Sequence, residues 1–392
     1  MLDHDRVPAL TDPYRRQTTA RLLENQEKFL SEATNVTADV AGFVPTVMAM
    51  VRRMAPKLIA YDVCGLQPLT MPNGRIFALR ARYATANPVS GQAEALFNEA
   101  DTDYSGTGTH LGDDPFAPQP AAPAPATYTT GAGKATAAGE VDPWNQMGVS
   151  IESVDVSVTT RQLRADYSLE LAQDMRAVHG LDADAELSAI LANEVTAEIN
   201  REIIRTIYGI AKQGAQFAGT AGTFDMNADS DGRWAGERYT GLMFAVERDA
   251  NKIALDTKMG KGNIVITSAD VASALAMAGL LSYTAAIKDI TNMEVDPTGP
   301  TFVGTMGRFR VFVDPYVSTN GYVVGYRGAN QYDAGFFYCP YVPLQMVRGQ
   351  NPVTLAPAIG YKTRYGLVNN PFTQMTAGGN SYYRKAAVKH LR

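Results

Sequence analysis

The sequence predicts an α+β fold, and two observations lead to this prediction. Apolar residues recur every three or four positions from Asp182 to Ile210, which indicates one long amphipathic helix. The second half of the chain holds short runs rich in Val, Tyr and Phe that are broken by Gly, Pro and Asn, as is typical of strands. Because helices and strands do not alternate regularly, mixed α+β is favoured over a parallel α/β arrangement.

The first predicted element is a helix over residues 14–30, YRRQTTARLLENQEKFL, whose apolar and uncharged side chains gather near one stripe. Acidic and basic residues are nearly balanced over residues 1–32, so a basic arm that binds nucleic acid is not expected. The pattern alone does not provide a partner for this helix. A helix without a partner in its own domain and a helix packed on that domain are equally good interpretations of this pattern.

Residues 71–83 carry a turn signal, MPNG, followed by RIFALRARY, in which apolar and basic residues alternate. This pattern predicts an exposed hairpin with a basic face. Between residues 111 and 140, Ala, Pro and Gly supply 18 of 30 residues, which leaves too few large apolar side chains for a core. A flexible linker or loop is expected there.

The segment Asp182–Ile210 has Asp182 as a candidate N-cap, and at ~1.5 Å per residue it predicts a rod of roughly 40 Å. A second helix is expected over Tyr239–Leu255, then a strand at 263–268 and an Ala-rich helix from Ala269. Further strands are predicted in RFRVFVDPY, GYVVGYRG and FFYCPYVPLQMV. Such a rod can serve as a spine for the fold.

The composition of the chain argues against several classes of function. The net charge of -5 would weakly repel a polyphosphate, so nucleic-acid recognition is not the leading expectation. Only Cys64 and Cys339 are present, which predicts two reduced buried thiols rather than a disulfide framework or a zinc site. The charged N-terminus and the lack of a long apolar run predict a soluble intracellular protein without a membrane segment.

No enzyme motif emerges from the sequence. GAGKAT at 131–136 fails as a phosphate loop because Tyr128 stands at the first Gly position and Ala135 at the Ser/Thr position. The four histidines are scattered, no Gly-x-Ser-x-Gly elbow occurs, and the pairs Asp182/Asp184 and Glu194/Glu198 are interpreted as solvated carboxylates. No catalytic residue, cofactor or metal site is therefore predicted.

Several runs closely resemble the major capsid protein of contractile-tailed, myovirus-type phages. They occur in order from about Val51 to Phe372 and cover roughly half of the chain. The runs are VRRMAPKLIAYDVCGLQPLTMPNGRIFALRARY, DPWNQMGVSIE, RQLRADYSLELAQDMRAVHGLDADAELSAILANEVTAEINRE, GRWAGERYTGLMFAVERDANKIA, RFRVFVDPY, YDAGFFYCPYVPLQMVRG and GYKTRYGLVNNPF.

The resemblance implies the HK97-like phage capsid fold, with an N-terminal arm, an extended loop, a peripheral domain that carries the spine helix, and an axial domain. The implied segments are a cleaved propeptide at 1–32, the arm at 33–70, the extended-loop region at 71–110, a linker or reduced insertion at 111–140, the peripheral domain at 141–239, the axial domain at 240–340, and a C-terminal return to the peripheral domain at 341–392. Members of this family commonly carry a folded insertion near the extended loop. Here the Ala/Pro/Gly-rich stretch occupies that place, so such an insertion is not expected.

The resemblance also implies processing by a prohead protease after a Leu-x-Glu signal. Leu30, Ser31 and Glu32 fit that signal, which places the expected cut between Glu32 and Ala33. Cleavage would remove a helix that first engages the internal scaffold. The alternative is an uncut helix that belongs to the mature shell.

The function implied is structural. Copies are expected to form hexameric capsomers of an icosahedral or prolate head that encloses DNA without sequence-specific binding, is assembled in the host cytoplasm, and matures by N-terminal proteolysis and shell expansion. The expected partners are further copies of the chain, a related vertex protein, a scaffold and the protease, with no membrane involved. The alternatives are an encapsulin-like compartment shell and an α+β enzyme with a dispersed site.

Overall fold

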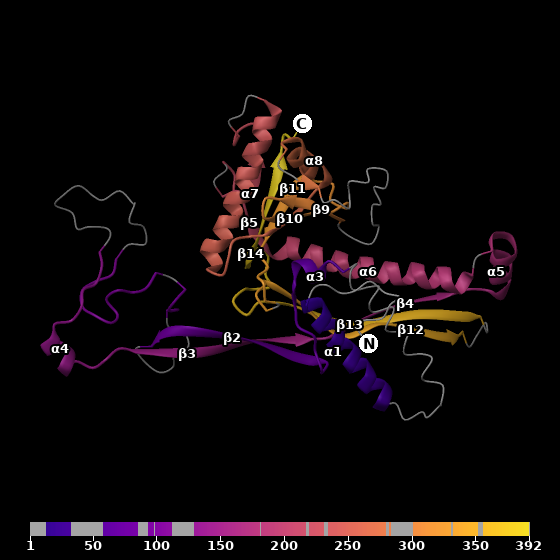
Figure 1. Ribbon diagram of the computed structural model, residues 1–392, viewed down its shortest axis with the longest axis horizontal. Coiled ribbons are helices and arrows are strands. Elements are labelled where there is room, and N and C mark those ends of the chain that lie inside the picture. Colours follow the sequence, from indigo (N-terminus) through magenta and orange to yellow (C-terminus); the bar gives the residue numbers. More distant parts are fainter. Residues whose placement is uncertain are drawn as a thin grey trace. The chain divides into compact units, whose positions relative to one another are not determined.

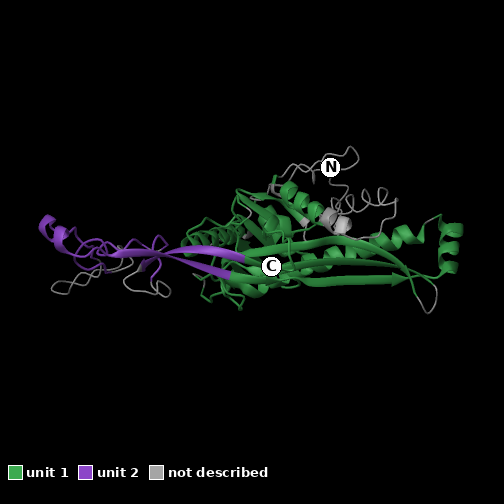
Figure 2. Ribbon diagram, turned by 90° about the horizontal axis from the view of Figure 1, so that it is seen from below, with its two compact units in different colours: residues 1–75, 154–392 green, residues 76–153 purple. Residues whose placement is uncertain are grey.

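The computed structural model describes residues 13–32, 58–84, 93–97, 99–111, 129–180, 182–216, 219–230, 234–279, 282–283, 301–330, 332–351 and 356–391. The chain divides into two compact units (Figure 2). The larger unit comprises residues 1–75 and 154–392, and the smaller unit comprises residues 76–153.

Helices and strands are both abundant, which confirms the α+β prediction (Figure 1). The helices are α1 (Pro13–Glu32), α3 (Ala60–Val63), α4 (Thr136–Val141), α5 (Leu169–Asp174), the π-helical turn η3 (Met175–His179), α6 (Ala183–Ile210), α7 (Ala235–Thr257) and α8 (Ala269–Met277). The strands are β1 (Gly65–Leu66), β2 (Asn73–Ala84), β3 (Gln146–Ser157), β4 (Thr159–Asp166), β5 (Ala211–Gln213), β6 (Thr223–Asp225), β7 (Ile264–Thr267), β8 (Ser282–Tyr283), β9 (Thr301–Met306), β10 (Phe309–Val313), β11 (Gly321–Gly325), β12 (Phe336–Gln350), β13 (Pro357–Asn369) and β14 (Asn380–Lys389).

Helix α6 confirms the long helix predicted for residues 182–210. It has 28 residues, and Asp182 is its N-cap residue. Ile199, Ile203 and Ile207 follow one another at four-residue steps, so they share one face, and all three are fully buried. Burial of this face against the rest of the larger unit, more than intrinsic propensity, stabilises a helix of this length.

A four-stranded sheet has the order β1-β12-β13-β4. Strands β12, β13 and β4 pair antiparallel, whereas the short edge strand β1 pairs parallel with β12. Helix α6 packs on β4 and β13, and α1 contacts β12. The buried side chains of Tyr361 and Tyr365 on β13 belong to the same apolar core as the isoleucines of α6.

The second sheet of the larger unit contains β7, β10 and β11, three of the predicted strands, whereas the strand predicted in FFYCPYVPLQMV is β12 of the four-stranded sheet. Its order is β5-β14-β11-β7-β10-β9-β8, with β6 also paired to β14. Strand β7 pairs parallel with β10 and antiparallel with β11. Helix α7 packs on β14 and β11, and Val265 and Val324 are fully buried in the core that this sheet shares with α6.

Residues 58–66, within the predicted arm, lie in the core of the larger unit. Leu58, Val63 and Leu66 are fully buried. The Ile59 backbone N–H donates to Asn200 Oδ1 of α6 at 3.0 Å, and the Tyr383 hydroxyl donates to the Val63 carbonyl at 3.2 Å. Residues 33–57 of the predicted arm lie outside the described residues, and the predicted domain boundaries remain predictions.

Strands β2 and β3 form a two-stranded sheet, called the ribbon below. The strand predicted in RIFALRARY lies within β2, but the predicted hairpin is wrong because the partner strand begins only at Gln146. The MPNG turn joins β2 to a different sheet: Gln67 and Leu69, just before it, donate their backbone N–H groups to carbonyls of β12 at 3.2 and 2.9 Å. The turn therefore connects two sheets instead of two strands of one hairpin.

The predicted linker at 111–140 contains ordered structure where the chain is described. Residues 112–128 lie outside the described residues. Thr107 pairs with Ala132 and Leu111 with Thr129 through isolated bridges, and α4 follows over Thr136–Val141. The second half of this Ala/Pro/Gly-rich stretch thus pairs with residues on its N-terminal side in the smaller unit.

Candidate functional site

The ribbon presents one apolar face to solvent. Phe77 and Leu79 on β2 are 66% and 67% exposed, and Met147, Val149 and Ile151 on β3 are 56–69% exposed. Residues two apart on a strand point to the same side, so each strand contributes a continuous apolar row. A contiguous exposed apolar surface of this kind marks an interaction site more often than single exposed residues do.

The basic side chains of β2 are paired within the ribbon and its loops. Arg80 forms ion pairs with Glu94 at 3.3 Å and Glu152 at 3.2 Å, and Arg82 pairs with Glu152 at 2.7 Å. Arg82 also donates to the Ser150 hydroxyl at 2.9 Å. The predicted exposed basic face is therefore wrong, because acids on β3 and on the following segment neutralise it. Among the described residues, the side of the ribbon that remains exposed to solvent without partners is the apolar one.

Helix α1 confirms the helix predicted at residues 14–30 and packs on its own chain. Leu22 and Leu23 are 3% and 7% exposed. Arg15 Nη2 lies 2.7 Å from Asp62 Oδ1, and its guanidinium lies 5.7 Å from the centre of the Tyr61 ring. Intramolecular packing, one of the two interpretations of the sequence, thus describes α1 in this structure.

The predicted processing signal lies at the C-terminal end of α1. The backbone of Leu30, Ser31 and Glu32 is helical, and Ala33 lies outside the described residues. The structure therefore places the signal on helical backbone at the end of α1.

One cluster of charged residues fixes α6 to the sheet that contains β4. Arg161 of β4 pairs with Glu198 at 2.9 Å and with Glu202 at 2.8 Å. Its Nε also donates to the hydroxyl of Tyr365, which in turn donates to Glu202. Burial, together with the bond to Glu202, raises the pKa of Tyr365, so the phenol stays protonated and can donate.

A second cluster fixes the same helix to the end of β10. The side chain of Asp314 is 0% exposed, pairs with Arg201 at 2.7 Å and accepts a hydrogen bond from the Tyr208 hydroxyl at 3.0 Å. Burial and the neighbouring carboxylate raise the pKa of Tyr208. A buried carboxylate with a charged partner and a hydroxyl donor is well satisfied.

Two carboxylates interpreted from the sequence as solvated are instead bonded. Glu198 pairs with Arg161, as described above. Asp184 pairs with Arg348 of β12 at 2.6 Å and accepts from the Tyr167 hydroxyl at 3.3 Å. Glu198 keeps 41% of its side chain exposed, so it is both solvated and paired, whereas Asp184 is mostly covered. The sequence did not reveal the partners because they lie far away in the chain and are brought to α6 by the sheet.

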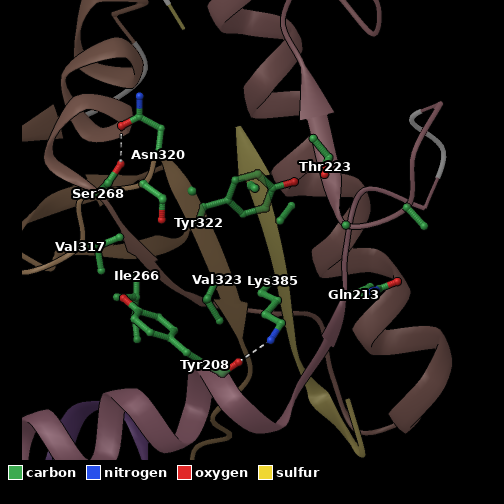
Figure 3. A pocket seen from close by; sticks show the side chains of 16 residues that line it. Tyr208, Gln213, Thr223, Ile266, Ser268, Val317, Asn320, Tyr322, Val323 and Lys385 are labelled. Carbon is green, nitrogen blue, oxygen red and sulfur yellow. Dashed lines mark hydrogen bonds between the residues drawn. The ribbon is translucent and has the colours of Figure 1, made fainter. Parts of the chain in front are cut away.

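A cavity of about 360 Å³ lies beside the second sheet (Figure 3). Lys385 is the only charged residue among those that line it, and its Nζ donates to the Tyr208 carbonyl at 2.6 Å. Figure 3 also shows the bond from the Ser268 hydroxyl to Asn320 Oδ1, at 3.4 Å. A cation near the C-terminal end of α6 interacts favourably with the helix dipole, so Lys385 has a structural role there.

The cysteines confirm the sequence prediction. Cys64 and Cys339 are both free and buried, and burial raises the pKa of each thiol to about 12. Within the described ranges, no group of three or more His, Cys, Asp or Glu side chains is arranged to hold a metal ion. No helix in the same ranges is both long and apolar enough to cross a membrane.

The family model for the major capsid protein Gp23 matches residues 40–388 of this chain. The chain belongs to the Gp23 major capsid protein family. The capsid chain is 41% identical to the major capsid protein of Serratia phage KSP90, over 95% of this chain and 92% of the relative. It is 34% identical to the major capsid protein of Enterobacteria phage T4, over 100% of this chain and 97% of the relative.

More distant similarities are also found. The capsid vertex protein of Enterobacteria phage T4 is 24% identical over 57% of the capsid chain and 53% of its own length. Among solved structures, the capsid of Myoviridae Phage XM1 aligns with 84% of the capsid chain and 92% of its own chain, at 9% identity and a TM-score of 0.43.

Family membership identifies the capsid chain as a structural component of the phage head shell and not as an enzyme. The predicted resemblance to myovirus-type major capsid proteins is confirmed, as is the virion capsid as its location. The mixed helices and sheets fit the HK97-like fold that the resemblance implied. The encapsulin-like shell and the dispersed-site enzyme are not favoured.

Sequence reasoning missed the apolar face of the ribbon. The signal was present in β3, where Met147, Val149 and Ile151 alternate with smaller or polar residues. Reading that alternation beside RIFALRARY would have indicated two strands of similar pattern. Their pairing across the long intervening segment could not be read from local sequence.

Proposed function

We propose that capsid chains assemble into hexameric capsomers in which the apolar face of the ribbon is buried against a neighbouring copy. The observation that carries this proposal is the exposure of Phe77, Leu79, Met147, Val149 and Ile151 on one ribbon. Fully burying one such side chain contributes roughly 1.5–3 kcal/mol. Repeated around each subunit, such contacts add up to a closed shell without any single strong bond.

The test replaces two apolar residues of the ribbon by serine, Phe77→Ser with Val149→Ser. We expect the variant to unfold at the same urea concentration as the parent chain but to form no closed particles in negative-stain micrographs. The matched control is Val178→Ser with Met277→Ser, which alters two residues of 74% and 78% exposure outside the ribbon. Normal particles from the ribbon variant would contradict the proposal.

Maturation by proteolysis supplies the second part of the proposed function. A prohead protease cleaves between Glu32 and Ala33, after the Leu30–Glu32 signal, and removes α1. Loss of contacts made only by the uncut chain shifts the equilibrium from a compact towards an expanded shell. Intact-mass analysis of mature particles should give Ala33 as the first residue, whereas Met1 or Leu2 in that position would contradict processing.

The remaining partners follow from the same proposal. A related vertex protein occupies the pentameric positions, an expectation supported by the similarity to a capsid vertex protein. An internal scaffold and the protease act during assembly in the host cytoplasm. The shell encloses DNA without reading its sequence, which is supported by the net charge of -5, because a strongly basic lining would hold the DNA to the wall.

A further inference from the structure

Helix α1 contacts both ends of one short segment of the chain, residues 62–69. Near its start, Arg15 Nη2 lies 2.7 Å from Asp62 Oδ1. Ten residues later, Asn25 Nδ2 donates to the Leu69 carbonyl at 3.0 Å. At 1.5 Å per helical residue, these two contacts are about 15 Å apart along the helix. The apolar side chains of Leu22 and Leu23 are buried in the same stretch of the helix.

The segment held in this way, residues 62–69, forms the edge of the four-stranded sheet. It contains β1, which pairs with β12 in only two residues. The backbone N–H groups of Gln67 and Leu69 continue this pairing by donating to the carbonyls of Tyr338 and Pro340. An edge of this kind has a neighbouring strand on one side only, so its stability depends on what covers it.

The same segment leads directly into the ribbon. Strand β2 begins four residues after Leu69. A Cβ atom placed on Gly74 would lie 2.4 Å from Leu69 Cδ2, so the first residues of β2 are in close contact with the end of the segment. Any movement of Leu69 would therefore change the contacts at the start of β2.

Asp62 has a second partner that does not belong to α1. Arg310 of β10 lies 3.4 Å from Asp62 Oδ1 and donates to the Asp62 carbonyl at 2.9 Å. The N-terminal end of the segment therefore keeps an anchor if Arg15 is lost. The Leu69 end has no comparable charged anchor among the described residues, so the effect of losing α1 is greatest there.

From these contacts we propose that α1 is an intramolecular strap that holds residues 62–69 on the sheet edge and so restrains the start of β2. While α1 is attached, Arg15 and Asn25 hold the two ends of the segment. When α1 is absent, the segment opens more often and the first residues of β2 gain freedom. The link to maturation rests on the proposed cleavage, but the strap itself does not.

Hydrogen exchange on the full-length unassembled chain tests the strap. The variant Arg15→Gln with Asn25→Ala should exchange the amide hydrogens of Gln67 and Leu69 roughly tenfold faster, which corresponds to 1.4 kcal/mol in the opening equilibrium. Peptides that cover Val265 and Val324 should exchange at unchanged rates, which would show that the core of the chain remains folded. The matched control is Arg21→Gln, which alters an exposed arginine on the same helix and should change neither set of peptides.

The exchange rates decide whether α1 acts as a strap, independently of whether it is cleaved. Unchanged exchange at Gln67 and Leu69 in the double variant would overturn the strap, as would an equal rise in the Arg21→Gln control. The single variants Arg15→Gln and Asn25→Ala should give intermediate rates, the second nearer to the double variant. Should mature particles retain residues 1–32 while the exchange result holds, the strap stands and only the proposed processing fails.

Discussion

The larger unit and the ribbon use the same kinds of residue in opposite ways. In the larger unit, isoleucines spaced along α6 are buried in a core that includes both sheets. In the ribbon, apolar residues spaced along β2 and β3 face solvent, although the arginines beside them are paired. The difference teaches that the larger unit buries its apolar side chains within one chain, whereas the ribbon pairs its charges and leaves its apolar face exposed, which is the face that we propose a neighbouring copy covers.

Thiol reactivity offers the largest contrast between the two regions. Burial raises the pKa of Cys64 and Cys339 to about 12, against the usual 9.0. A cysteine introduced on the ribbon by Leu79→Cys should keep an ordinary pKa, so at pH 8 its reactive thiolate fraction is about a thousandfold larger. Iodoacetamide labelling followed by peptide mass spectrometry should therefore modify position 79 first. Equal labelling of Cys64 would show that the core of the larger unit opens readily.

Truncation of matched isoleucines gives the next largest effect. Ile203→Ala removes a fully buried side chain of α6 and should lower the free energy of unfolding by about 2–5 kcal/mol. Ile151→Ala on the ribbon should change it by no more than about 0.5 kcal/mol, because that side chain is already in water. Urea denaturation of the unassembled chains measures both. A large loss for Ile151→Ala would mean that the ribbon face is covered within its own chain.

Neutralisation of matched carboxylates gives the smallest effect. Asp314→Asn weakens two bonds of a fully buried group and should cost about 2 kcal/mol in the free energy of unfolding. Asp155→Asn, in β3, removes a pair with Arg75 in which the acid is 73% exposed, so the change should be close to nothing. Thermal unfolding of the two variants in the same buffer measures both changes. Equal losses of stability would contradict the difference between the core and the ribbon.

Much of the fold could be predicted because it is encoded locally. The four-residue spacing of apolar side chains along α6 and the Val- and Tyr-rich runs of β10, β11 and β12 indicate their own secondary structure. The burial of Cys64 and Cys339 was likewise predicted from composition. The resemblance to myovirus capsid proteins was available from ordered sequence runs, and it predicted the function that family membership confirms.

The rest depended on contacts between distant parts of the chain. Arg161 meets Glu198 and Glu202 only because β4 is placed beside α6, and no spacing rule connects them. The partner of β2 is separated from it by a long segment, so the local pattern suggested a hairpin instead. Processing at Glu32 and Ala33 and the domain boundaries stay predictions.

Helix α6 has a mechanical consequence that follows from its two charged clusters. Glu198 and Glu202 tie it to one sheet through Arg161, and Arg201 and Tyr208 tie it to the other through Asp314. The two sets of bonds overlap along the same few turns, so the helix acts as a beam shared by both sheets. Moving one sheet relative to the other would therefore require contacts of Arg161 or of Asp314 with this helix to break.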